Sequence, residues 1–229
     1  MKFHKPHCAS LQNVSSNVMK TQKDKTLNSL LIFILFAIVQ CGFGQNVQTF
    51  LNEADSAEKN SDYKKAIKCY KKAIKLDPNS ADAFLGLGDC KRMLRKHNSA
   101  IKYYDRSIAI NSKNEIAFNH RGFSKMSLQK YSDALEDFSK AIGIDSTYWG
   151  FYSNRGDAKT ELNNFQSAID DYVKAKELSP PSSDLGDIYY AIALNKIKLG
   201  DKIDACRWLN LADKLGNTSA KDEIKNTCH

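Results

Sequence analysis

The chain has 229 residues, 42 % of them apolar and 26 % charged, as in an ordinary globular protein with a substantial core. Only 4 prolines and 11 glycines occur, which excludes a collagen-like chain. The formal charge of +8 overstates the basic character, because outside residues 1–44 there are 29 basic and 25 acidic residues. These charges alternate in sign along the chain, so we expect no one-sided basic stripe for nucleic acid.

The first 44 residues have the order of a secretory signal peptide. Residues 1–26 are polar and include five lysines, and ten consecutive apolar residues follow at 30–39. Gly42 and Gly44 then provide the small side chains that a signal peptidase requires. The apolar run is shorter than the roughly 20 residues of a membrane-spanning helix. We therefore expect cleavage after Gly44, export to the periplasm or the medium, and no membrane insertion of the mature chain.

Details of this segment leave alternatives. A start at Met19 gives the signal peptide normal proportions, so we expect Met19 to be the true first residue. The ending at residues 43–46, Phe-Gly-Gln-Asn, resembles signal peptides of Bacteroidota-type bacteria. An uncleaved signal that anchors the chain is one alternative. Lipidation of Cys41 is another, although Gln40 stands where a lipobox has a small residue.

From residue 47 onward the sequence repeats itself every 34 residues. Four independent series share this period, and chance does not produce such agreement. They are Gly88, Gly122 and Gly156; Ala66, Ala100, Ala134 and Ala168; Phe50, Phe84, Phe118 and Tyr152; and Tyr70, Tyr104, Phe138 and Tyr172. Within each period the apolar residues have helical spacing, so we expect each unit to be a pair of helices that buries its apolar face only by stacking on its neighbours.

The pattern resembles the tetratricopeptide repeat (TPR), whose signature is aromatic-x2-Leu-Gly, then Ala-x3-aromatic, then Pro. Phe84-x2-Leu87-Gly88 carries the first part, and Ala66-x3-Tyr70 with Pro78 carries the second. The resemblance implies an all-α, right-handed α-solenoid of helix hairpins over residues 47–219, ended by a capping helix and tail at 220–229. We expect five repeats, the last after an insertion at 183–185: 47–80, 81–114, 115–148, 149–182 and 186–219.

In this family the first helices of the repeats line a concave groove, mainly at repeat positions 2, 5, 9, 12 and 13. The resemblance thus implies that partner-binding residues lie at these positions. Acidic and apolar residues dominate the set, so we expect a protein or peptide partner with apolar anchors and some basic residues. The alternative is that single members of the set pack on neighbouring helices. The set is Asp55, Asp82, Leu85, Asp89, Met93, Asn119, Phe123, Met126, Asp157, Tyr190 and Leu194.

Two ion pairs follow from comparing the repeats with each other. Arg121 and Arg155 occupy position 7 only in the third and fourth repeats, and Asp137 and Asp171 occupy position 23 only in the same repeats. Their joint occurrence predicts structural Arg–Asp bridges between stacked helices.

The four cysteines beyond residue 44 form two pairs with similar spacing. Cys69 and Cys90 are 21 residues apart, and Cys206 and Cys228 are 22 apart, each pair across an antiparallel turn. An exported chain can oxidise such pairs, so we expect the disulfides Cys69–Cys90 and Cys206–Cys228. The alternative is four buried free thiols, because spacing alone does not show whether the Cβ atoms face each other.

The sequence favours a binding function over an enzymatic one. It contains no GxSxG, P-loop, HExxH, CxxC or dinucleotide-binding motif, and we expect no metal and no cofactor. The Lys/Asn/Arg clamp with which some TPR proteins bind a C-terminal carboxylate is absent at the matching positions. We therefore expect an exported scaffold or adaptor that binds protein in its groove. The alternative is a structural accessory subunit of an envelope enzyme or secretion complex; the sequence does not specify the oligomeric state.

Overall fold

The computed structural model describes residues 47–228. The chain divides into two units: residues 1–49, of which 47–49 are described, and residues 50–229, which are described as far as 228. The expected signal peptide, the Met19 start and Cys41 lie outside the described residues. The following account concerns the larger unit.

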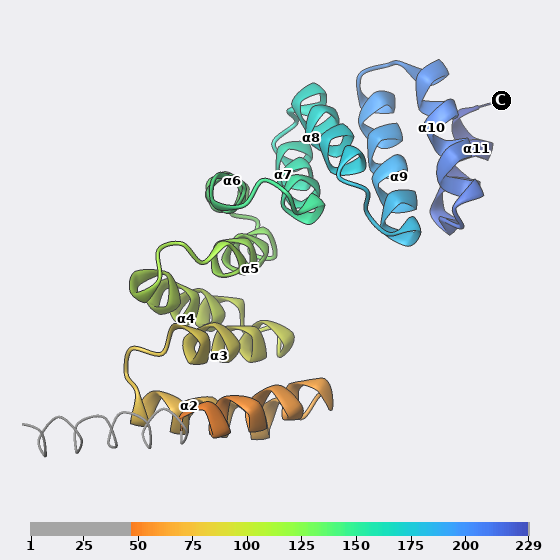
Figure 1. The fold of residues 1–229 in the computed structure, drawn as a ribbon. Coiled ribbons are helices and arrows are strands. Elements are labelled where there is room, and N and C mark those ends of the chain that lie inside the picture. The colour runs from red at the N-terminus through yellow and green to blue at the C-terminus, as the bar shows by residue number, and fades with distance from the viewer. Residues whose placement is uncertain (1–46, 229) are drawn as a thin grey trace, which may run out of the picture. The chain divides into compact units, whose positions relative to one another are not determined.

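Residues 50–228 are built from helices joined by short turns (Figure 1). A helix over residues 47–59 is followed by ten more, α2 to α11, and from α2 onward each packs against the next along the chain. Their bounds are α2 Tyr63–Leu76, α3 Ala81–Met93, α4 His97–Ile110, α5 Glu115–Met126, α6 Tyr131–Ile144, α7 Trp149–Glu161, α8 Phe165–Glu177, α9 Ser182–Lys198, α10 Lys202–Lys214 and α11 Thr218–Thr227.

The turn inside each hairpin uses one conformation five times. Position 15 of every repeat has a positive φ, between 56° and 59° in the first four repeats and 83° in the fifth. The backbone N–H groups around this residue bond back to the last carbonyls of the first helix, which ends that helix and reverses the chain. The residues at this position are Ser61, Arg95, Gln129, Asn163 and Gly200.

The connections between successive hairpins are also specified locally. Ser80 and Asn114 accept hydrogen bonds from the backbone N–H groups of Ala83 and Ala117 and thereby cap α3 and α5. One turn earlier, Asp77 accepts a bond from the backbone N–H of Asn79 and holds the chain extended after α2. The segment around Pro78 therefore ends one helix and caps the next.

The first helix of the last repeat begins earlier than residue 186, where the sequence pattern places the start of that repeat. The segment at 183–185, expected to be an insertion, belongs to the first turn of α9, which starts at Ser182. Ser179 ends α8 with φ 59°, and Pro181 precedes α9 and accepts a hydrogen bond from the Leu185 N–H. A proline is compatible with the start of a helix, because the first N–H groups have no intrahelical partner. The C-terminal helix α11 likewise starts at Thr218, two residues before the expected cap.

The core follows the 34-residue period. The repeated alanines Ala66, Ala100, Ala134 and Ala168 are fully buried, as expected where two helices approach closely. The aromatic ring at position 24 packs directly on the glycine at position 8. In the second repeat, a Cβ added to Gly88 would lie 2.5 Å from Cε1 of the fully buried Tyr104. Only glycine allows this approach, and the same contact recurs at Gly122 and Gly156.

Candidate functional site

The inner face of the array carries two recessed sites lined by residues from the expected groove set. We call the first the Arg92 pocket; it has a volume of about 300 Å³ and lies between α3, the start of α4 and α5. Its lining residues are Arg92, Met93, Arg95, His97, Phe123 and Ser127. We call the second the Asp157 pocket; it has a volume of about 180 Å³ and lies between α7, α8 and α9. Its lining residues are Asp157, Thr160, Glu161, Tyr172, Tyr190, Ala191, Leu194 and Asn195.

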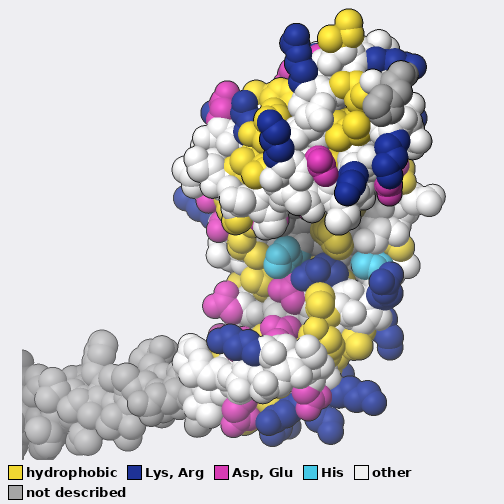
Figure 2. Space-filling model, turned by 90° about the vertical axis from the view of Figure 1, so that its right-hand side faces the viewer, with side chains coloured by type: hydrophobic (Ala, Val, Ile, Leu, Met, Phe, Trp, Pro, Cys, Tyr) yellow, Lys and Arg dark blue, Asp and Glu magenta, His cyan; other side chains and the backbone are white. Residues whose placement is uncertain are grey.

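Five of the eleven expected groove residues line these two pockets. Met93 and Phe123 come together in the Arg92 pocket, and Asp157, Tyr190 and Leu194 come together in the Asp157 pocket. Met93 and Phe123 are 50 % and 46 % exposed, unusually high values for large apolar side chains. Figure 2 shows apolar, basic, acidic and histidine side chains together where this face of the molecule is hollowed.

Three of the expected groove acids are hydrogen-bonded within the chain. Each sits at position 9 of its repeat and accepts a bond of 2.8 Å from the tyrosine hydroxyl at position 24, fifteen residues later. Burial and the neighbouring carboxylates raise the pKa of all three tyrosines, so the hydroxyls stay protonated and donate. The pairs are Asp55–Tyr70, Asp89–Tyr104 and Asp157–Tyr172. These acids therefore hold the two helices of a hairpin together as well as facing the groove.

The other two repeats replace both partners of this pair. The third repeat has Phe123 and Phe138 at positions 9 and 24, and the fifth has Leu194 and Leu209. Positions 9 and 24 are thus either both polar or both apolar. A polar residue at one position with an apolar residue at the other would leave a buried polar group without a hydrogen bond. This joint variation is visible in the sequence, but our sequence analysis missed it. It explains why Phe123 presents an apolar side chain to the groove where neighbouring repeats have an acid.

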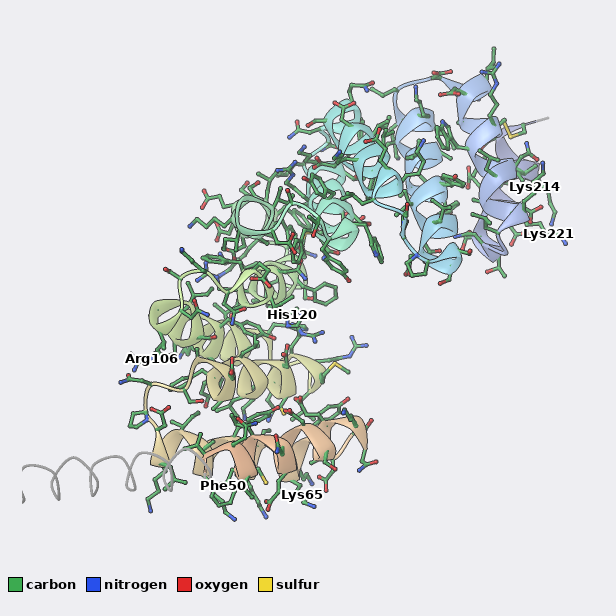
Figure 3. All side chains as sticks on the ribbon, in the orientation of Figure 1. Phe50, Lys65, Arg106, His120, Lys214 and Lys221 are labelled. Atoms are coloured by element: carbon green, nitrogen blue, oxygen red, sulfur yellow. A yellow bond between two sulfur atoms is a disulfide. The ribbon has the colours of Figure 1, made fainter. Side chains whose placement is uncertain are left out.

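Asp89 is the most heavily shared of these acids. Its Oδ1 accepts the Tyr104 hydroxyl, lies 2.7 Å from Nδ1 of His120 and lies 3.4 Å from Nη2 of Arg92. Burial acts to raise the pKa of Asp89, but His120, Tyr104 and Arg92 together lower it below its usual range. His120 lies on the inner side of the array, whereas Arg106 lies on the outer side (Figure 3). Asp89 is thus an anion whose Oδ1 is shared by three neighbouring side chains of the chain itself.

Asp157 has the opposite environment. Asp157 is exposed at the rim of the pocket, but desolvation of its carboxyl group and the nearby Glu161 raise its pKa to about 6. The hydrogen bond from Tyr172 counteracts this only partly. No Lys or Arg lines the Asp157 pocket, so the two pockets differ in charge.

Two of the expected groove residues also contribute to packing between helices. Asn119 is buried and accepts a bond of 2.9 Å from Asn154 Nδ2 in the next repeat, and Met126 packs on a core cluster of Ala134, Phe138 and Ala158. Asn119 is thus engaged by the next repeat, whereas Met126 stays partly exposed, and partner binding by these two residues remains a prediction. Leu85 and Asp82 line neither pocket. Asp82 is exposed in the first turn of α3, where a negative charge favours the helix dipole.

Both expected Arg–Asp pairs are present. Arg121 donates to Asp137 through Nε and Nη2 at 2.9 and 2.6 Å, and Arg155 donates to Asp171 in the same way at 2.8 and 2.7 Å. Each pair joins the two helices of one hairpin. A lysine at position 11 completes each site: Lys125 lies 2.8 Å from Asp137, and its counterpart Lys159 lies 2.7 Å from Asp171. The sequence analysis missed these lysines, although they share a repeat position.

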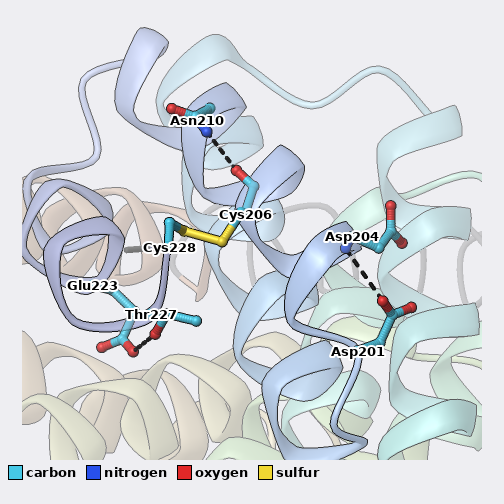
Figure 4. Close-up of a disulfide and its surroundings, with 7 residues drawn as sticks. All are labelled: Asp201, Asp204, Cys206, Asn210, Glu223, Thr227 and Cys228. Atoms are coloured by element: carbon cyan, nitrogen blue, oxygen red, sulfur yellow. Dashed lines mark hydrogen bonds between the residues drawn. A yellow bond between two sulfur atoms is a disulfide. The ribbon is translucent and has the colours of Figure 1, made fainter.

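One of the two expected disulfides exists in the structure. Cys206 on α10 is bonded to Cys228 at the end of α11, with their Cα atoms 5.8 Å apart (Figure 4). This bond attaches the terminal helix to the last hairpin. Glu223 and Thr227 of α11 are themselves linked by a hydrogen bond of 2.7 Å.

The expected Cys69–Cys90 disulfide is wrong, because both cysteines are buried free thiols. Cys69 Sγ lies 3.7 Å from Glu53, whereas Cys90 donates to Glu58 at 2.9 Å. These two acids are five residues apart on one helix, which separates them by about 7.5 Å along its axis. The two thiols therefore lie at different positions along the axis of the helix that carries Glu53 and Glu58. Burial and the adjacent carboxylates raise the pKa of both, which makes them poor nucleophiles.

Residues 47–228 contain no group of three or more His, Cys, Asp or Glu side chains placed to hold a metal ion. Among the helices of this same stretch, none has the length and apolar content required to cross a membrane.

Comparison with known proteins identifies the repeats. Residues 59–90 match a TPR repeat model, and residues 81–114 and 150–182 match a tetratricopeptide repeat model. A search of curated proteins finds no match.

Similar solved structures include a crystal structure of MamA, with 22 % identity and a TM-score of 0.67 over 78 % of this chain and 96 % of that one. MamA from Desulfovibrio magneticus RS-1, residues 41 to the end, has 14 % identity and a TM-score of 0.68 over 74 % and 94 %. YrrB, a TPR protein with an unusual peptide-binding site, has 16 % identity and a TM-score of 0.67 over 80 % and 97 %. The chain therefore contains tetratricopeptide repeats and has the all-α, right-handed solenoid fold of TPR proteins.

Proposed function

We propose that this chain is a non-catalytic protein-interaction scaffold that binds a partner segment on the inner face of its repeats. The observation that carries the proposal is the exposure of Met93 and Phe123 within one recessed pocket. A folded chain gains stability by covering such side chains, so their clustering on a concave face indicates a surface that a partner covers. The fold shared with YrrB, which has a peptide-binding site, is consistent with this use of the surface.

The repeats themselves supply a variant that removes the apolar surface and preserves the fold. Phe123→Asp combined with Phe138→Tyr converts the third repeat to the Asp–Tyr arrangement of its neighbours. The matched control is Ile203→Asp, which adds the same charge to a side chain that is 78 % exposed and lines neither pocket.

The experiment places a photo-crosslinking phenylalanine analogue at position 123 or 203 of the chain in its native cell. We expect a discrete adduct from position 123 and none from 203, and mass spectrometry then identifies the partner. Co-purification of that partner should fall at least tenfold in the Phe123→Asp, Phe138→Tyr variant and stay constant in Ile203→Asp. Unchanged co-purification in the double variant would contradict groove binding and favour a structural accessory role.

We further propose that the scaffold is exported. The signal-peptide pattern at residues 1–44 supports this, and the Cys206–Cys228 disulfide suits an oxidising compartment. Fractionation followed by N-terminal sequencing should find a mature chain that begins at Gln45. A cytoplasmic chain that retains residues 1–44 would contradict export.

A further inference from the structure

The Arg92 pocket combines apolar surface with positive charge that the chain itself does not neutralise. Arg95 is exposed and makes no ion pair with any residue of 47–228. Arg92 has a single acidic neighbour, Asp89, at 3.4 Å, and that carboxylate is already shared with Tyr104 and His120. Asp89 therefore neutralises Arg92 only in part, and the pocket keeps a net positive charge.

Two nitrogen atoms at this pocket lack hydrogen-bond partners. Nε of Arg92 and Nδ1 of His97 are buried and bond to no atom of the described chain. Buried polar atoms without a partner are rare in folded proteins, because an unmade hydrogen bond costs about 1–3 kcal/mol, and Nε of Arg92 is always a donor. The pKa of His97 also reflects the local potential: burial lowers it, and the charges of Arg92 and Arg95 lower it further. The field in the pocket therefore favours an anion.

The apolar part of the pocket adjoins these donors. The Arg92 guanidinium lies 5.7 Å from the centre of the Phe123 ring, and the half-exposed Met93 also lines the pocket. A ligand that satisfies both parts needs a carboxylate beside an apolar side chain. The Asp157 pocket provides the contrast within the same array, because Asp157 and Glu161 line it and no cation does.

We propose that the Arg92 pocket binds an internal segment of a partner protein in which a side-chain carboxylate stands next to an aromatic or aliphatic residue. The carboxylate bonds to Arg92, Arg95 and His97, and the apolar side chain covers Met93 and Phe123. This inference rests on the proposed groove function and reverses the charge expected for the partner from the sequence. Three of the acids that suggested a basic partner are bound to tyrosines of the chain itself.

The test uses the full chain and fluorescent peptides with both termini blocked. One peptide contains Glu-Glu-Phe-Leu, a second replaces both Glu by Gln, and a third has the Gln sequence with a free C-terminal carboxylate. Fluorescence anisotropy should show binding at least tenfold tighter for the Glu peptide than for either Gln peptide. Raising the salt concentration should weaken the binding of the Glu peptide, since the pocket is open to solvent.

The repeats again provide folding-compatible variants. Arg95→Gln introduces the residue that the third repeat has at the same left-handed position, Gln129, where φ is 59° compared with 56° at Arg95. The control is Arg106→Gln, which removes the same positive charge from the outer side of the array, away from the Arg92 pocket (Figure 3). We expect Arg95→Gln to weaken binding of the Glu peptide about fivefold to tenfold and Arg106→Gln to leave it unchanged.

Equal binding of the Glu and Gln peptides would overturn the proposal, as would equal effects of Arg95→Gln and Arg106→Gln. Preferential binding of the peptide with the free C-terminus would also overturn it. Each of these results, combined with a partner adduct at position 123, would refute the carboxylate specificity while leaving the groove function in place.

Discussion

Replacing Gly88 by alanine tests how the hairpins are held together. A Cβ at this position would lie 2.5 Å from Cε1 and 2.7 Å from Cδ1 of Tyr104. Non-bonded carbon atoms normally approach to about 3.5–4 Å, so the ring or helix α3 must move by about 1 Å. The ring cannot move freely, because Tyr104 is fully buried and its hydroxyl is bonded to Asp89 at 2.8 Å.

The expected cost is the balance of two effects. Overpacking of a filled core costs about 1–3 kcal/mol, and weakening the bond to the charged Asp89 adds to that cost. Alanine in a helix interior regains up to about 1 kcal/mol compared with glycine. We therefore expect Gly88→Ala to lower the free energy of unfolding by about 2 kcal/mol.

Gly143 is the matched control for this substitution. It lies in the last turn of α6, and a Cβ added there meets no atom within 4 Å. Gly143→Ala should therefore raise the free energy of unfolding by about 0.5 kcal/mol through helix propensity alone. Urea denaturation followed by far-ultraviolet circular dichroism compares the two variants. If Gly88→Ala proves as stable as Gly143→Ala, the close approach of Tyr104 to the glycine is not real.

Three further variants test other features of the array by the same measurement. Replacing Cys206 and Cys228 by serine should lower stability by about 3 kcal/mol, the value for closing a loop of this length; a reductant that destabilises both proteins equally would contradict this. Asp137→Ala leaves Arg121 and a lysine without their shared buried acceptor and should cost about 3 kcal/mol, whereas a loss under about 1 kcal/mol would show that solvent compensates. Asp157→Asn tests the pH dependence of stability. The folded-state pKa of Asp157, about 6, lies above its usual value, so the natural chain loses stability progressively as the carboxyl group ionises between about pH 4 and above pH 6. The Asn variant should thus gain stability over the natural chain at about pH 7 but not at about pH 4, by on the order of 1 kcal/mol after allowing for solvent screening, and an equal difference at both pH values would refute this.

Residues that change together from one repeat to another predicted side-chain contacts that the 34-residue period alone does not. The Arg–Asp pairs were predictable because both partners change together between repeats, and Arg121 and Asp137 are indeed joined by two hydrogen bonds. The Asp–Tyr pairs carry the same signal at positions 9 and 24 and could have been predicted in the same way. Cysteine spacing was a weaker guide, since similar separations gave one disulfide and one pair of free thiols. The sequence separation of two cysteines shows on which helices they lie, but it does not show whether their side chains meet at the same level of the packed helices.

The sequence by itself determined the helix hairpins, because caps, turns and apolar periodicity act over a few residues and recur every 34. It could not determine which groove residues remain available to a partner. That depends on side chains that meet from different helices, as when Asn154 covers Asn119 from 35 residues away or Tyr104 binds Asp89 from 15 residues away. Only the tertiary structure shows that Asp55, Asp89 and Asp157 have internal hydrogen-bond partners, while Arg95 makes no ion pair with any residue of 47–228. A groove side chain forms hydrogen bonds with whichever neighbouring side chain lies close enough, and the packing of the helices decides which neighbours are close.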